Sequence, residues 1–308
     1  MARLDPQVER VLERLPEIAR DRMSPDEARR ASRERGALLH PPSAAVARVF
    51  ERTLRTAAGD VGVRVYAPGG TDLPALVYLH GGGWVLGDLD APDALCRRLA
   101  NAARCVVVSV DYPLAPEHPF PVALEASYAV TKWLAENARS LDVDPSRIAV
   151  GGESAGGNLA AAIALAARDR GGPRLVFQVL LVPVLNYAFD TPSYAENAEG
   201  YRLTRNEMQW FWSHYLRDVA DGANPYASPL RANDLSRVPP AVIVIAEFDP
   251  LRDEGEAYAR RLRDSGVAVE CRRYEGVVHG FIPMAGEVDS ADRAIDDIGR
   301  ALRTAFSR

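Results

Sequence analysis

Two hydrophobic patterns alternate along this chain. Continuous apolar runs rich in β-branched residues come between segments in which apolar side chains recur every three or four positions. A continuous run is typical of a strand buried on both faces, and the recurrence is typical of an amphipathic helix. The alternation predicts a largely parallel sheet with helices on both faces, that is, an α/β fold. The runs are residues 61–66, 75–79, 105–110, 148–150, 175–182, 241–246 and 267–274, and the helical segments are 95–103, 122–137, 158–168, 254–264 and 289–305.

Two segments do not follow this alternation. Residues 1–50 read as helices without strands, with a capping box and Pro at the first helical position in Ser24-Pro25-Asp26-Glu27. Residues 185–225 contain a second helical stripe of bulky side chains. We expect these two segments to pack together as a helical cap over a core made of residues 51–184 and 226–308. The alternative is that both are ordinary peripheral helices. The stripe consists of Met208, Phe211, Trp212 and Tyr215.

Composition narrows the class of protein. A chain of 308 residues with 47% hydrophobic content can bury a large core, as one α/β domain or two smaller ones. The net charge of -5 comes from interspersed signs, which gives no support for a nucleic-acid or anionic-membrane partner. Neither an apolar secretory segment nor a membrane span is evident. Three scattered cysteines fit no disulfide framework or zinc ribbon, so we expect a cytoplasmic protein.

A candidate nucleophile lies in Gly152-Glu153-Ser154-Ala155-Gly156. This G-x-S-x-G sequence follows a predicted strand and precedes a helix of small residues, so the backbone can bend sharply and present the serine oxygen above the sheet. The N–H of Ala155 would lie at the positive end of that helix, which suits a developing oxyanion. A glycine-rich turn with an incidental serine would explain the bend but not the partners described next.

A second glycine-rich loop, His80-Gly81-Gly82-Gly83-Trp84, follows the strand at 75–79. Its three glycines let the backbone pass close to a substrate and turn N–H groups inward, as in an oxyanion-stabilising loop. A purely structural turn is the alternative. His80 itself is better placed to orient this loop than to act as a base.

A general base and its orienting acid are expected downstream of the serine. Of five histidines, His214 and His279 follow Ser154, and His279 comes just after the last predicted strand, whereas His214 lies inside the cap helix. For the acid we favour Asp249, which lies just beyond a strand end before the stiffening Pro250. Glu247 is the closest rival, while Asp253 and Glu254 suit the first turn of the next helix.

Together these motifs resemble the bacterial carboxylesterases related to hormone-sensitive lipase, which have the α/β-hydrolase fold. The resemblance runs from about residue 75 to 283 and includes Asp111-Tyr112-Pro113-Leu114-Ala115-Pro116-Glu117 and His279-Gly280-Phe281. Glu153 and Pro113 depart from the usual Asp and Arg of the family. The family implies an eight-stranded sheet, a helical cap and hydrolysis without metal or cofactor. It also implies oxyanion donors at the N–H groups of Gly82, Gly83 and Ala155, with Gly81 shaping the loop.

The expected function is hydrolysis of short- to medium-chain esters through Ser154, His279 and Asp249. We expect bulky side chains to close an apolar substrate slot, with packing inside the fold as the alternative for each. An amidase such as an arylformamidase, a peptidase and a lipase use the same triad. A ligand-binding module like the plant gibberellin receptor, in which the histidine is replaced, is disfavoured because His279 is present. Family members often pair through the last strand, which leaves a homodimer open. The slot residues are Trp84, Met208, Phe211, Trp212, Tyr215 and Phe281.

Overall fold

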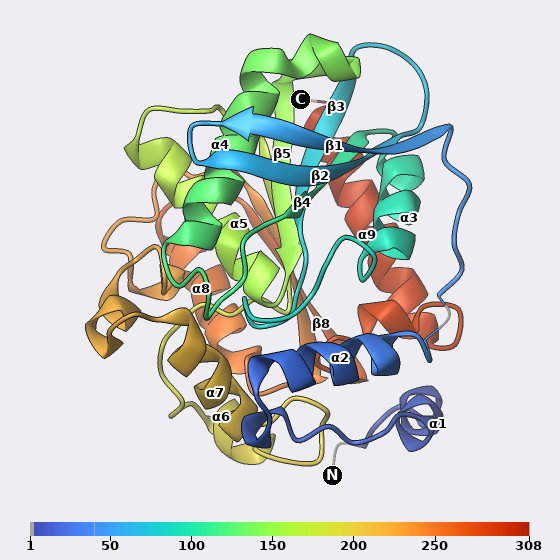
Figure 1. Cartoon of the computed structure of the whole chain (residues 1–308), viewed down its shortest axis with the longest axis vertical. Coiled ribbons are helices and arrows are strands. Elements are labelled where there is room, and N and C mark those ends of the chain that lie inside the picture. Colours follow the sequence, from blue (N-terminus) through green and yellow to red (C-terminus); the bar gives the residue numbers. More distant parts are fainter. Residues whose placement is uncertain (1–2, 40, 308) are drawn as a thin grey trace.

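The computed structural model describes residues 3–39 and 41–307, which form a central sheet of eight strands with helices on both faces (Figure 1). The strand order is β1-β2-β4-β3-β5-β6-β7-β8. Strands β3 to β8 are mutually parallel, and β2 runs antiparallel to both of its neighbours. The predicted α/β-hydrolase fold with a mostly parallel sheet is confirmed. The strands are β1 (Arg48–Thr56), β2 (Gly59–Ala67), β3 (Leu73–Leu79), β4 (Val106–Asp111), β5 (Val143–Glu153), β6 (Phe177–Leu181), β7 (Ala241–Phe248) and β8 (Val269–Val278).

Helices cover the two faces of the sheet in separate layers. Side chains of α4, α5 and α8 pack with those of one face, and side chains of α1, α3 and α9 pack with those of the other. Strand residues alternate between these cores, so that Val77 joins the first while Leu76 and Tyr78 join the second. The α-helices are α1 (Pro6–Arg14), α2 (Pro25–Gly36), α3 (Asp93–Ala103), α4 (Val122–Asn137), α5 (Ala155–Asp169), α6 (Pro192–Glu196), α7 (Arg205–Tyr215), α8 (Arg252–Asp264) and α9 (Asp289–Phe306), and the 3₁₀ helices are η1 (Arg20–Arg22), η2 (Ala138–Leu141), η3 (Val219–Ala223), η4 (Pro229–Arg231) and η5 (Ile282–Met284).

The two segments outside the strand-helix alternation lie at the same end of the molecule. Helices α1 and α2 from the N-terminal segment and helices α6 and α7 from the insertion all lie at this end, with α1 on the side away from α6 and α7 (Figure 1). Arg20 of η1 donates to Glu207 of α7 at 2.6 Å and to Ser32 of α2 at 3.2 Å. The predicted capping box of α2 is present, because Ser24 accepts from the N–H of Glu27 while Glu27 accepts from the N–H of Ser24. The bond between Arg20 and Glu207 connects the two segments directly.

The first strand differs from the sequence prediction. β1 begins at Arg48, inside the stretch 1–50 that was expected to be helical without strands. It is an edge strand paired only with β2, and most of its side chains are exposed or half-buried. Its sequence therefore lacks the continuous apolar run of a central strand. β8 is the other edge, and the pairing of two copies through it stays a prediction.

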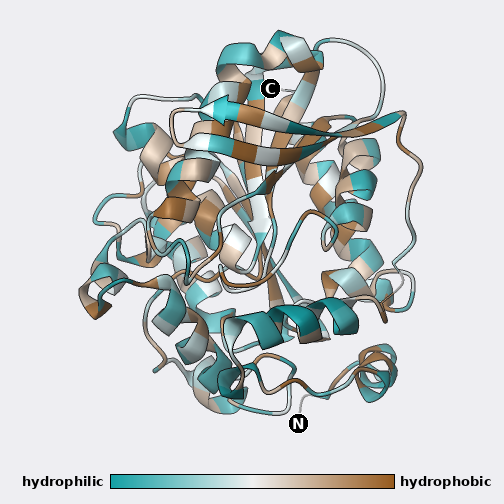
Figure 2. Cartoon of the chain, viewed as in Figure 1, coloured by the Kyte–Doolittle hydropathy of each residue, from teal (hydrophilic) through white to brown (hydrophobic). Residues whose placement is uncertain are grey.

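Hydropathy follows the layers of the fold. The central strands are mainly hydrophobic, whereas α2 is strongly hydrophilic along its length (Figure 2). Within residues 3–39 and 41–307, no helix combines the length and apolarity needed to cross a bilayer. Across the same ranges, His, Cys, Asp and Glu side chains form no group of three that could hold a metal ion. The three cysteines are free thiols, with Cys96 and Cys105 buried.

Candidate active site

Ser154 occupies the sharp turn between β5 and α5. Its backbone has φ 56° and ψ -115°, a conformation that non-glycine residues rarely adopt and that occurs where surrounding structure enforces it. The neighbouring glycines make this turn feasible: a Cβ at Gly156 would lie 2.0 Å from the carbonyl oxygen of Leu79. Hydrogen bonds from Ser154 N to Leu181 O and from Val184 N to Ser154 O fix the turn against β6. The predicted strand-to-helix elbow is therefore present.

Ser154, His279 and Asp249 form a continuous hydrogen-bonded chain. His279 Nε2 lies 3.0 Å from Ser154 Oγ, and His279 Nδ1 lies 2.8 Å from Asp249 Oδ2. Asp249 is 1% exposed, while Ser154 retains 8% exposure. Asp249 is therefore shielded from water, and Ser154 is buried apart from this small exposed fraction. The structure brings these three sequence-predicted residues together from the β5–α5 turn, the β7–α8 loop and the loop after β8.

The rival residues are engaged elsewhere. Glu247 Oε2 accepts the N–H of Gly276 at 2.7 Å, so this carboxylate fastens β8 to β7. His214 packs edge-on against Trp210, with ring centroids 4.5 Å apart. His118 is exposed, and His40 lies outside the described residues. These placements leave His279, which is hydrogen-bonded to Asp249, as the imidazole that contacts the serine.

The loop that carries Asp249 is held by residues of the insertion 185–225. The sequence did not indicate this support. Asp249 Oδ1 accepts the N–H of Leu251 at 2.8 Å, and Asn197 donates to the carbonyl of Asp249 at 3.3 Å. The hydroxyl of Ser193 in α6 donates to the carbonyl of Pro250 at 2.7 Å, and its backbone N–H donates to Asp253 Oδ2 at 2.8 Å. Ser193 lies in the short helix α6 and Asn197 caps its end, in a stretch with no recognisable motif, so only the fold reveals this role.

The glycine-rich loop after β3 passes beside the elbow. A Cβ at Gly81 would lie 3.3 Å from the carbonyl oxygen of Glu153. His80 is buried and stacks on Tyr112, whose hydroxyl donates to the carbonyl of His80 at 2.8 Å. Burial lowers the pKa of His80, which favours its neutral form. His80 therefore orients the loop, as expected. Within residues 3–39 and 41–307, no hydrogen bond involves the N–H of Gly82 or Gly83.

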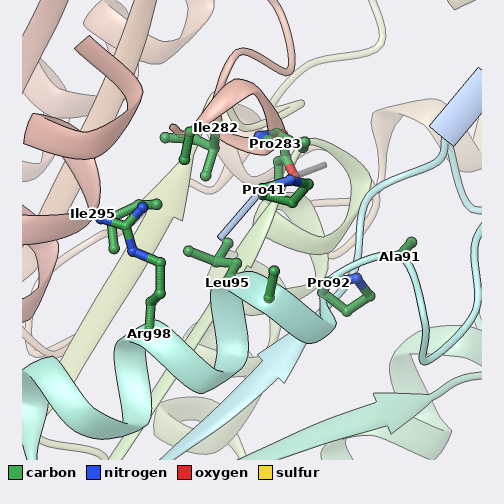
Figure 3. A pocket seen from close by; sticks show the side chains of 11 residues that line it. Pro41, Ala91, Pro92, Leu95, Arg98, Ile282, Pro283 and Ile295 are labelled. Carbon is green, nitrogen blue, oxygen red and sulfur yellow. The ribbon is translucent and has the colours of Figure 1, made fainter. Parts of the chain in front are cut away.

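Glu153, a departure from the family pattern, lines a small cavity beside the elbow. The cavity has a volume of about 30 Å³ and is bordered by Pro41, Arg98, Ile282 and further side chains (Figure 3). Burial raises the pKa of Glu153, while the nearby charges of His279 and Arg202 lower it and that of Asp249 raises it. A carboxyl group thus lies close to the proposed base without forming part of the hydrogen-bonded chain.

The six predicted slot residues occupy different surroundings. Trp84 stacks on Tyr215 with ring centroids 4.0 Å apart and contacts Trp212 at 4.6 Å, so these three make one buried aromatic cluster. Phe211 packs onto the glycine-rich loop: a Cβ at Gly83 would lie 2.1 Å from its ring. Met208 is buried on the same helix as Phe211. Phe281 packs with Tyr274 in the core on the other face of the sheet. Their contact with substrate stays a prediction.

Comparison with known proteins identifies the family. Residues 76–283 match a family model described as having the alpha/beta hydrolase fold. The chain belongs to the hormone-sensitive-lipase-like carboxylesterases of that fold. It is 42% identical to esterase LipI of Mycobacterium tuberculosis over 97% of this chain and 94% of the relative. It is 39% identical to ethyl acetate hydrolase of Pseudomonas putida over 90% of this chain and 89% of the relative.

Solved structures agree with this membership. A thermostable esterase of Pseudomonas putida superposes with a TM-score of 0.95 at 38% identity, covering 98% of both chains. An esterase of the archaeon Pyrobaculum calidifontis superposes with a TM-score of 0.91 at 42% identity, also covering 98% of both chains. The resemblance read from the motifs is therefore confirmed over nearly the whole chain.

Proposed function

We propose that this chain is a serine carboxylesterase that hydrolyses short- to medium-chain esters through an acyl-enzyme intermediate. The observation that carries the proposal is the hydrogen-bonded chain from Asp249 through His279 to Ser154, at 2.8 and 3.0 Å. These are hydrogen-bond distances for a nucleophile, a base and the group that orients the base. The names of the relatives, which include an esterase and an ethyl acetate hydrolase, support the substrate class.

In the proposed mechanism, Ser154 Oγ attacks the ester carbonyl carbon while His279 Nε2 takes its proton. Asp249 accepts the hydrogen bond from Nδ1–H, which holds the productive tautomer and stabilises the imidazolium. The N–H groups of Gly82, Gly83 and Ala155 stabilise the oxyanion. His279 then returns the proton to the departing alcohol. A water molecule, deprotonated by the same imidazole, attacks the acyl-enzyme and releases the acid and Ser154.

The N-terminal segment and the insertion 185–225 form, in this proposal, a cap that bounds the acyl slot. Phe211 supports this arrangement because it packs directly on Gly83 of the oxyanion loop. Each methylene that fits the slot adds up to about 0.8 kcal/mol of transfer free energy. A chain that outgrows the slot leaves methylenes in water or strains the cap. We therefore expect kcat/KM to rise from nitrophenyl acetate and to fall before palmitate.

The decisive experiment compares wild type, Ser154→Ala and the control variant His214→Ala on matched nitrophenyl esters and anilides. Ser154→Ala should lose on the order of 10⁴- to 10⁶-fold in kcat and should resist labelling by an organophosphate. His214→Ala should behave like wild type. Retention of a tenth of the activity by Ser154→Ala would remove the serine from the mechanism. Faster cleavage of the anilides than of the esters would favour an amidase, and a continuous rise to palmitate would favour a lipase.

A further inference from the structure

Arg29 of the N-terminal helix α2 bonds to the backbone next to the glycine-rich loop. Arg29 Nε donates to the carbonyl of Val85 at 2.9 Å, and its Nη2 donates to the carbonyl of Ala115 at 2.9 Å. Val85 immediately follows the glycine-rich loop, and its own N–H bonds back to the carbonyl of Gly82 at 3.1 Å. The N–H of Ala115 bonds to the carbonyl of Trp84 at 2.9 Å. Arg29 thus bonds to Val85 and Ala115, which are themselves hydrogen-bonded to residues of the glycine-rich loop.

Two carboxylates accept the remaining hydrogen bonds of the Arg29 guanidinium. Glu117 accepts from Nη1 at 2.7 Å and from Nη2 at 2.6 Å, and Asp26 accepts from Nη1 at 3.3 Å. Every nitrogen of the guanidinium is therefore engaged, and the side chain is only 16% exposed. The hydrogen bonds from Arg29 lower the pKa of Glu117 to about 2, so the pair stays ionised wherever the protein is assayed. A lysine, with three donors on one nitrogen, cannot reproduce this fork.

The loop that Arg29 holds has an unusual backbone. Gly82, Gly83 and Trp84 have φ values of 122°, 59° and 60°, three consecutive residues in the positive region. Trp84 is not a glycine, and such conformations persist where the surroundings over-determine them. Trp84 is fixed on its side-chain face by the aromatic cluster with Trp212 and Tyr215. The bonds of Arg29 to the carbonyls of Val85 and Ala115 fix the backbone where the chain leaves the loop.

We propose that Arg29 is a positioning residue for the oxyanion hole. Through it, α2 holds the N–H groups of Gly82 and Gly83 where negative charge develops in the transition state. The inference rests on the proposed function, since it assigns a role within the same reaction. Arg29 itself does not reach the reacting atoms. Its effect should therefore appear in transition-state stabilisation and not in ground-state binding.

The test compares Arg29→Ala and Arg29→Lys with Arg33→Ala, an exposed arginine on the same helix. Active sites are counted first, by the stoichiometry of organophosphate labelling of Ser154, and kcat is expressed per labelled site. Arg29→Ala should lower this kcat roughly 10- to 100-fold with KM within about 2-fold, because small misplacement of oxyanion donors is costly. Arg29→Lys should fall between wild type and Arg29→Ala, and Arg33→Ala should match wild type.

A second readout separates positioning from mere folding support. A trifluoromethyl ketone forms a reversible tetrahedral adduct on the serine and places an oxyanion in the hole, so its affinity should fall by the same factor as kcat. Loss of labelled sites with unchanged kcat per site, a rise confined to KM, or unchanged ketone affinity would each overturn the inference. If Arg29→Ala does not fold, Arg29→Lys and Glu117→Gln carry the test. Activity retained by Ser154→Ala would instead refute the proposed function.

Discussion

Replacing Asp249 by Asn probes the hydrogen-bonded chain most directly. In wild type, Asp249 Oδ1 accepts the N–H of Leu251 at 2.8 Å. In the variant, the amide oxygen can still accept this N–H. The amide nitrogen then faces His279 Nδ1 in place of Oδ2. Because an NH₂ group donates, Nδ1 becomes an acceptor and the proton moves to Nε2. Nε2 can then no longer accept the proton of Ser154, so the fold persists while the wrong tautomer is stabilised.

The expected loss is about 10⁴-fold in kcat, which corresponds to about 5.4 kcal/mol of transition-state stabilisation. Glu247→Gln is the matched control, since this carboxylate stands two residues earlier and bonds to Gly276 N instead of the imidazole. A glutamine oxygen can keep that bond, so the control should stay within about 3-fold of wild type. Nitrophenyl butyrate hydrolysis at several pH values provides the assay. A loss below tenfold in Asp249→Asn, or an equal loss in Glu247→Gln, would refute the assignment.

Two further predictions concern packing and burial. Gly83→Ala places a Cβ 2.1 Å from the Phe211 ring, so it should lower the free energy of unfolding by about 1–3 kcal/mol. The loss should be smaller in a Phe211→Ala background, and urea unfolding measures both. Burial raises the pKa of Glu254 well above 4.5. The native state therefore retains a proton that the unfolded chain releases, so the free energy of unfolding should fall as pH rises above about 4.5. Glu254→Gln should flatten this dependence, and an unchanged slope between pH 5 and 8.5 would contradict the reasoning.

The sequence predicted the central strands because each is buried on both faces and is therefore continuously apolar. It also predicted the order of Ser154, Asp249 and His279, since the fold places loops that follow parallel strands at one edge of the sheet. The edge strand β1 was not predicted because its exposed positions carry three arginines, a glutamate and a threonine. Its start at Arg48 also shortens the predicted N-terminal helical segment.

Arg29 could not be found from the sequence. It stands in an arginine-rich helix in which Arg30 and Arg33 are exposed and Arg35 is buried. Its partners at Val85 and Ala115 are backbone carbonyls, and carbonyls carry no residue-type signal. The slot residues show a related ambiguity, because an apolar stripe at helical spacing looks the same whether it contacts substrate or packs inside the fold. Trp212 and Tyr215 contact Trp84, which is a tertiary relation that no local pattern encodes.

The position of β8 has a consequence for how activity emerges as the chain folds. Ser154 and His279 are 125 positions apart. His279 follows β8, which is the last strand in the sequence and an edge strand paired with β7. During synthesis, the serine elbow and the glycine-rich loop leave the ribosome well before the imidazole does. Under the proposed mechanism, a nascent or truncated chain lacking β8 carries a serine without a base. Recovered hydrolysis in a refolding experiment would therefore time the docking of this C-terminal strand, a non-local event, and not the collapse of the core.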